Sequence, residues 1–122
     1  MSFPTITIKV VNLETSTGLT SLVDQKFQTL EKLIPVGETD VYCEVELEKL
    51  AAHQTGKVYR AEANLRVAGK LYRGEANEDQ IEKAIDVVRN ELRRELEKSH
   101  GKRQSLVKRG KQAIKQMMRF GA

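Results

Sequence analysis

The chain opens with a β-branched run and continues with apolar residues at helical spacing. Residues 5–11 read TITIKVV, a composition that favours a strand. After Ser16, a residue type that caps helices, apolar residues recur at steps of three and four. They are Leu19, Leu22, Val23, Phe27, Leu30, Leu33 and Ile34. This spacing predicts a helix that ends near Leu33, because Pro35 opposes further helix and Gly37 follows as a turn residue.

From residue 41 the pattern changes to alternation of apolar and polar residues, which is typical of half-buried strands. In the first alternating segment the apolar phase comprises Val41, Cys43, Val45 and Leu47. After the turn sequence HQTGK, the apolar phase comprises Tyr59, Ala61, Ala63, Leu65 and Val67, which predicts an antiparallel neighbour. A tight turn at residues 68–70 then leads to a fourth strand, with Tyr72, Gly74 and Ala76 on its inner side.

A second helical pattern follows the fourth strand. Asn77, with Gln80 three residues later, fits a variant of the capping box and predicts the start of a helix. The apolar stripe of this helix comprises Ile81, Ala84, Ile85, Val88, Leu92 and Leu96. We expect the helix to run to about Lys98, before the residues Ser99, His100 and Gly101 break it.

The order of the expected elements is βαβββα. Two helices, each with one apolar face, are expected to pack on one face of a four-stranded sheet, giving a two-layer α+β domain. We assign this domain to residues 1–101, and the remaining residues 102–122 to a basic, partly amphipathic tail. Gly110 disfavours helix in the tail by about 1 kcal/mol relative to Ala, so we expect the tail to order on a partner.

Charge is unevenly distributed along the 122 residues, whose formal net charge is +4. Residues 98–122 hold eight Lys/Arg and no acid, whereas residues 1–97 hold 13 basic and 17 acidic residues. The end of the chain therefore carries +8 and the rest −4. A block of like charge of this length is usually neutralised by nucleic acid or by an anionic membrane.

The residues needed for catalysis are missing from the pattern. His53 and His100 have no Cys or His partner at metal-ligand spacing, and no glycine motif for nucleotide phosphates occurs. Cys43 lies in an alternating strand and is expected to be a buried structural thiol, and the glutamates of residues 44–48 to lie on a solvated sheet face. We therefore expect no enzyme, no metal, no cofactor and no small-molecule substrate.

The sequence also argues against export and membrane insertion. The start MSFPTITIKV has no basic leader before an apolar run. No stretch approaches the roughly 18 consecutive apolar residues that a membrane span needs. We expect a cytoplasmic protein without a membrane partner.

Basic residues flank the apolar stripe of the second expected helix. At 100° per residue, Arg94 and Lys98 lie within about 40° of each other on one flank, and Arg89 and Arg93 lie on the other. Alternatively, these residues form surface ion pairs with nearby glutamates, worth at most about 1 kcal/mol each. Because the chain has three Tyr, three Phe and no Trp, contacts to phosphate and sugar are expected to dominate over base stacking. The candidate RNA-binding residues are Arg89, Arg93, Arg94, Lys98, Lys102, Arg103, Lys108, Arg109 and Lys111.

Four ordered motifs resemble the ribosome hibernation promoting factor and ribosome-associated translation inhibitor family, over about residues 5–102. They are ITIKVVNLETS, LTSLVDQKFQTLEKL, VYCEVELEK and, most specific, AIDVVRNELRRELEK, which is like the family's AID-x-x-x-x-x-L-x-R-x-L-x-K. The resemblance implies a domain similar in shape to double-stranded RNA-binding domains. In the family, this domain occupies the decoding region of the small ribosomal subunit and excludes messenger and transfer RNA.

The resemblance also implies a basic cleft between the two helices. Carried over to this sequence, the cleft residues are Lys26, Arg94, Lys98 and Lys102. Thr29 and Glu91 depart from the pattern, because relatives often carry lysine there, so affinity is expected to depend more on the tail. Long members have a C-terminal dimerisation domain, and this chain looks like a short form, expected to be a monomer in solution.

The resemblance therefore implies a bacterial stress-response factor that binds ribosomal RNA and inhibits translation by steric exclusion. A different class of function stays open. In this alternative the chain is a regulatory interaction module whose tail, with Met117, Met118 and Phe120, binds a partner protein or an anionic membrane.

Overall fold

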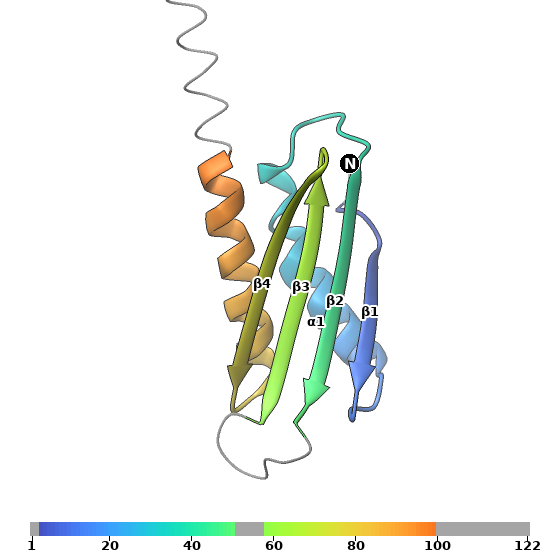
Figure 1. The fold of residues 1–122 in the computed structure, drawn as a ribbon. Coiled ribbons are helices and arrows are strands. Elements are labelled where there is room, and N and C mark those ends of the chain that lie inside the picture. Colours follow the sequence, from blue (N-terminus) through green and yellow to red (C-terminus); the bar gives the residue numbers. More distant parts are fainter. Residues whose placement is uncertain (1–2, 51–57, 100–122) are drawn as a thin grey trace, which may run out of the picture.

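A computed structural model describes residues 3–50 and 58–99, which form a four-stranded sheet with two helices on one face (Figure 1). The elements are β1 (Ile6–Val11), α1 (Thr17–Gln28), a 3-10 turn (Glu31–Leu33), β2 (Val41–Lys49), β3 (Tyr59–Val67), β4 (Lys70–Glu78) and a second helix over residues 81–99. The predicted βαβββα order and α+β class are confirmed. The HQTGK turn and the predicted boundary between domain and tail lie outside the described residues.

The strands are ordered β1-β2-β3-β4 across the sheet. β1 pairs with β2 in parallel, because α1 carries the chain back across one face between them, and the other two pairs are antiparallel. The register places Ile6 beside Cys43, Cys43 beside Leu65, and Leu65 beside Tyr72. The inward positions of all four strands therefore form continuous rows, as the alternation predicted.

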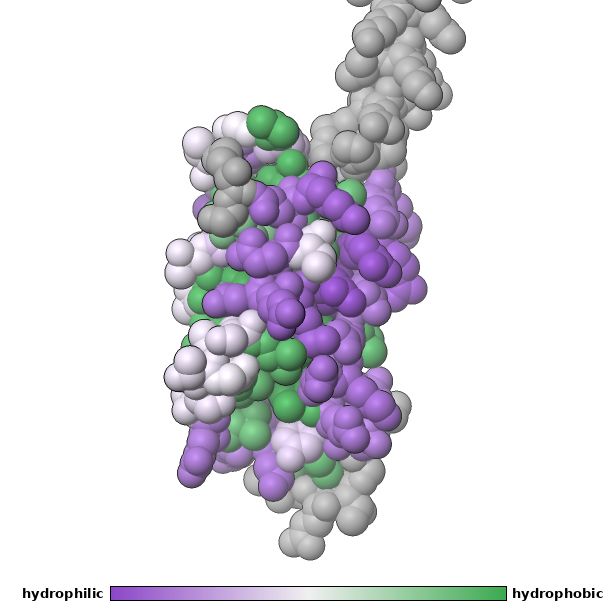
Figure 2. Space-filling view, turned by 180° about the vertical axis from the view of Figure 1, so that it is seen from behind, coloured by the Kyte–Doolittle hydropathy of each residue, from purple (hydrophilic) through white to green (hydrophobic). Residues whose placement is uncertain are grey.

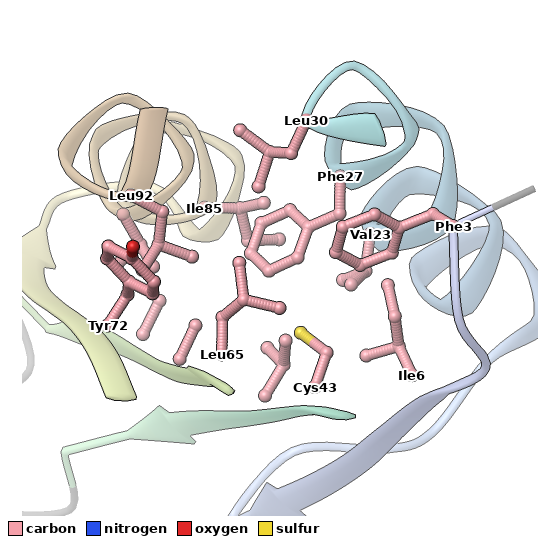
Figure 3. Packing of buried hydrophobic residues seen from close by; sticks show 14 of the residues in the cluster. Phe3, Ile6, Val23, Phe27, Leu30, Cys43, Leu65, Tyr72, Ile85 and Leu92 are labelled. Carbon is pink, nitrogen blue, oxygen red and sulfur yellow. The ribbon is translucent and has the colours of Figure 1, made fainter. Parts of the chain in front are cut away.

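The core lies between these rows and the two helices (Figure 3). The buried apolar residues of the helices and the turn are Val23, Phe27, Leu30, Leu33, Ala84, Ile85, Val88, Leu92 and Leu96. All of them belong to the two predicted apolar stripes. The ring of Phe3 packs edge-on against that of Phe27, with centroids 6.5 Å apart. Burial of each large side chain contributes about 1.5–3 kcal/mol.

Two predicted local signals are confirmed. The side chain of Ser16 caps α1, because its Oγ accepts a hydrogen bond of 3.0 Å from the Leu19 N–H. The turn between β3 and β4 consists of Ala68 and Gly69, both with left-handed backbone, at φ values of +50° and +82°. Two consecutive left-handed residues match the twist of a two-residue hairpin turn. Gly adopts the left-handed conformation without strain.

The first helix ends earlier than predicted, at Gln28 instead of near Leu33. The N–H groups of Leu30 and Leu33 donate to the carbonyls of Phe27 and Leu30, each at 3.0 Å. The chain thus continues with bonds between residues three apart, and both leucines stay buried. Apolar periodicity did not predict this change because α and 3-10 geometry both bring residues three apart to one side.

The predicted cap at Asn77 is wrong. β4 continues to Glu78, and Asn77 pairs with Arg60 of β3 in the sheet. The helix begins at residue 81 and still continues at Ser99, beyond its predicted end at Lys98. A side-chain cap contributes only about 1 kcal/mol, so continued strand pairing decides the backbone conformation of Asn77.

The second helix lies very close to β4 at Gly74. A Cβ atom there would lie 3.1 Å from the Val88 carbonyl oxygen and 3.2 Å from Oε2 of Glu91. The same Glu91 oxygen accepts a hydrogen bond of 3.2 Å from the N–H of Glu75. The helix therefore also provides an acceptor to the backbone of β4, the last strand of the sheet.

Gly74→Ala is expected to lower the free energy of unfolding by about 1–3 kcal/mol, because the added methyl group forces the helix and the strand apart. Urea denaturation measures the change. Gly18→Ala is the control, since a Cβ at Gly18 meets only Ser16 Oγ, 4.0 Å away, and alanine favours helix by up to about 1 kcal/mol. Equal stability of the Gly74→Ala variant and the unsubstituted protein would contradict the close packing.

Candidate nucleic-acid interface

Hydrophilic side chains dominate the face on which the helices lie, and apolar residues reach its surface in patches (Figure 2). Of the ten predicted RNA-binding residues, five lie in the described part of the chain: Lys26, Arg89, Arg93, Arg94 and Lys98. Lys102, Arg103, Lys108, Arg109 and Lys111 lie outside it, as do His53 and His100. All five described candidates therefore lie on α1 or on the second helix.

Lys26 links α1 to the second helix. Its Nζ donates a hydrogen bond of 2.6 Å to Oδ1 of Asp86 and lies 3.6 Å from Oε1 of Glu82. Only 18% of the Lys26 side chain is exposed. Two carboxylates of the second helix thus compensate its charge, and the pairing holds the two helices together.

Arg89 lies beside the same carboxylate. Its Nε donates to Oδ1 of Asn90 at 2.9 Å, and its Nη1 donates to Oγ1 of Thr29, the residue that follows α1, at 3.3 Å. Its Nη2 lies 3.9 Å from Oδ1 of Asp86. The structure therefore brings Arg89 and Lys26 together around Asp86.

The other three described candidates lie on the exposed surface of the second helix. Arg93 is 3.9 Å from Glu97, and Lys98 is 3.3 Å from Glu95. These are solvent-exposed pairs within one helix, of the kind worth at most about 1 kcal/mol. Arg94 is exposed and forms no hydrogen bond or ion pair with residues 3–50 or 58–99. Its guanidinium is thus available to an external anion.

Ser99 fixes the last described turn of the second helix to the β3–β4 hairpin. The hydroxyl of Tyr72 donates to Oγ of Ser99 at 2.7 Å, and Nζ of Lys70 donates to the same oxygen at 3.1 Å. Ser99 was predicted to break the helix, and instead it continues the helix and makes a contact that was not predicted. The signal was Tyr72 on the inner side of its strand, since a buried tyrosine hydroxyl needs a polar partner.

The opposite, open face of the sheet carries an acidic cluster around Arg60. The carboxylates that contact Arg60 are Glu46 at 3.5 Å, Glu48 at 3.5 Å, Glu75 at 3.2 Å and Glu62. Burial lowers the pKa of Arg60, but the hydrogen bond to Glu75 and the surrounding negative charges raise the pKa by more in total. Arg73 also contacts Glu62, at 3.0 Å, so two arginines face four glutamates. This local excess of negative charge disfavours phosphate near Arg60.

Cys43 is fully buried, as predicted. Burial, followed by the charge of Glu44, raises the pKa of its thiol to about 12. Within residues 3–50 and 58–99, no group of three or more His, Cys, Asp or Glu residues is arranged to hold a metal ion. None of the helices in these ranges is long and apolar enough to span a bilayer.

The family model described as Sigma 54 modulation protein / S30EA ribosomal protein matches residues 6–104. The fold is similar to the crystal structure of the N-terminal domain of Thermus thermophilus Protein Y, with a TM-score of 0.64 and 23% identity, covering 76% of this chain and 96% of that chain. It is also similar to a ribosomal subunit interface protein from Coxiella burnetii, with a TM-score of 0.62 and 16% identity, covering 79% of this chain and 97% of that chain. At these identities the likeness establishes the fold. No curated protein matches the chain.

Ser99→Ala is expected to lower the free energy of unfolding by about 1–3 kcal/mol, because the buried hydroxyl of Tyr72 loses its acceptor. The double variant Tyr72→Phe/Ser99→Ala removes both partners and should lose less stability than Ser99→Ala alone. Tyr42→Phe is the control, since the Tyr42 hydroxyl bonds Glu44 on the exposed face and water replaces that contact. Additive losses in the urea-denaturation cycle would contradict the coupling of Tyr72 and Ser99.

Proposed function

The chain belongs to the Sigma 54 modulation protein / S30EA ribosomal protein family, and from this membership we propose that it is a ribosome hibernation factor. In this proposal it binds the decoding region of the small ribosomal subunit and blocks messenger and transfer RNA. The name of the solved Coxiella burnetii relative, a ribosomal subunit interface protein, supports the ribosome as the partner.

The separation of charge along the chain carries the proposal. All 17 acidic residues lie in the described part of the chain, together with 13 of the 21 basic residues, so this part carries −4. Residues 100–122 hold seven basic residues and no acid. Arg94 and Lys98 lie on the exposed surface of the helix that leads into this segment. Phosphate is therefore favoured at the helix end and the tail, and disfavoured near Arg60 on the open face of the sheet.

The proposed mechanism requires no chemical step. Binding energy comes from contacts to ribosomal RNA phosphates and from the release of their counterions. Inhibition follows because the bound protein fills the path of messenger and transfer RNA. We propose a binding protein of the cytoplasm, not an enzyme.

Co-sedimentation with purified small ribosomal subunits across a salt series tests the proposal. We expect binding that weakens with salt, with a log-log slope of roughly 0.7–0.9 per phosphate contact. Excess messenger and initiator transfer RNA should release the protein, and isolated large subunits serve as the control. Binding that does not change with salt, or that excess messenger and transfer RNA do not reduce, would indicate a different binding site.

The double variant Arg94→Glu/Lys98→Glu is expected to bind small subunits about 100-fold more weakly, at about tenfold per lost contact, with a salt slope reduced by about two. Its thermal unfolding should change little, because both side chains are exposed. The matched control is Lys9→Glu/Lys49→Glu, which changes the net charge equally at exposed positions on β1 and β2. Equal losses of affinity in the two double variants would contradict a specific interface on the second helix.

A further inference from the structure

One carboxylate oxygen contacts two cationic side chains between the two helices. Oδ1 of Asp86 lies 2.6 Å from Nζ of Lys26 and 3.9 Å from Nη2 of Arg89. The two cations come from different helices, and each is less than one-fifth exposed. Asp86 is thus the shared contact that sets the spacing of Lys26 and Arg89.

Both cations keep hydrogen-bond donors for a ligand. The ammonium of Lys26 has three N–H donors and one hydrogen bond, to Asp86. The guanidinium of Arg89 has five N–H donors, and it uses its Nε–H on Asn90 and one Nη1–H on Thr29. The arrangement orders both groups without using all of their donors.

An acid at an RNA interface has an unfavourable direct effect, because its charge repels phosphate. A second effect opposes this. Lysine and arginine side chains lose rotamer freedom when they bind, and groups ordered in advance avoid that loss. At Asp86 the geometry favours the second effect, since its contacts restrain two long side chains at once.

We propose that Asp86 is a positioning residue, which holds Lys26 and Arg89 as a preformed phosphate-binding pair of the RNA interface. The inference rests on the proposed function and adds to it an acid that strengthens RNA binding. Simple electrostatics predicts the opposite sign, because neutralising an acid should tighten binding to RNA.

Glu82 provides the matched control within the same cluster. Its side chain is 60% exposed and lies 3.6 Å from Nζ of Lys26. It has the same charge as Asp86 on the same helix, but no contact with Arg89 is present among the described residues. Glu82→Gln therefore removes a carboxylate charge while leaving the contacts of Asp86 with both cations in place.

The experiment measures the affinity of Asp86→Asn and Glu82→Gln for purified small ribosomal subunits, at fixed salt and across a salt series. Asp86→Asn should bind about fivefold more weakly, with a salt slope reduced by about one, because the pair no longer contacts phosphate as a unit. Glu82→Gln should bind as tightly as the unsubstituted protein or more tightly. A purely structural role of Asp86 would change thermal unfolding but not the salt slope.

A double-variant cycle tests whether Asp86 acts through Lys26. In the Lys26→Met background, Asp86→Asn should have a smaller effect or should tighten binding. If Asp86→Asn does not fold, Asp86→Ser provides the same test with a smaller side chain. Unchanged or tighter binding of the folded Asp86 variants overturns the positioning role while the proposed function stands. Failure of the unsubstituted protein to bind small subunits overturns the proposed function, and the inference with it.

Discussion

The second helix contacts β4 at Gly74, an inward position of the strand without a side chain. The arrangement of the basic residues depends on this contact. With a Cβ at Gly74, the Val88 carbonyl oxygen would be only 3.1 Å away, so the backbones meet almost directly. A helix is rigid over a few turns, and this contact therefore also sets the rotation of Arg89 and Arg94 around the helix axis. It sets the distance to α1 as well, on which the 2.6 Å bond between Lys26 and Asp86 depends.

Patterns that repeat along the chain predicted most of the fold. The alternation from Val41 to Leu47 and the stripe from Ile81 to Leu96 each combine many buried positions, so one irregular residue does not change the result. Single-residue signals were weaker, because a cap such as the one predicted at Asn77 competes with strand pairing of greater total energy. The bond between Lys26 and Asp86 joins positions 60 residues apart and depends on helix rotation, which no local pattern contains.

The described residues carry a net charge of −4, which is unusual for a protein with a proposed RNA interface. The location of the acidic residues explains how the two properties fit together. Four glutamates are gathered around Arg60 on the open face of the sheet, away from the helices. On the helical face, acids such as Asp86 and Glu82 are paired with cations. Residues 100–122 add seven basic residues and no acid, so positive charge is concentrated at one end of the sequence. A charge distribution of this kind orients a protein as it approaches a polyanion.

Cys43 lies in the middle of the sheet, in the row with Ile6, Leu65 and Tyr72, and burial raises the pKa of its thiol to about 12. Thiol reagents attack the thiolate, which is scarce near neutral pH in the native state. Modification therefore requires a transient opening of the structure that exposes β2. Because the chain has one cysteine, its rate of labelling records how often the core opens, without any engineered probe. Measured with and without a bound partner, this labelling rate reports how strongly the partner stabilises the domain against opening.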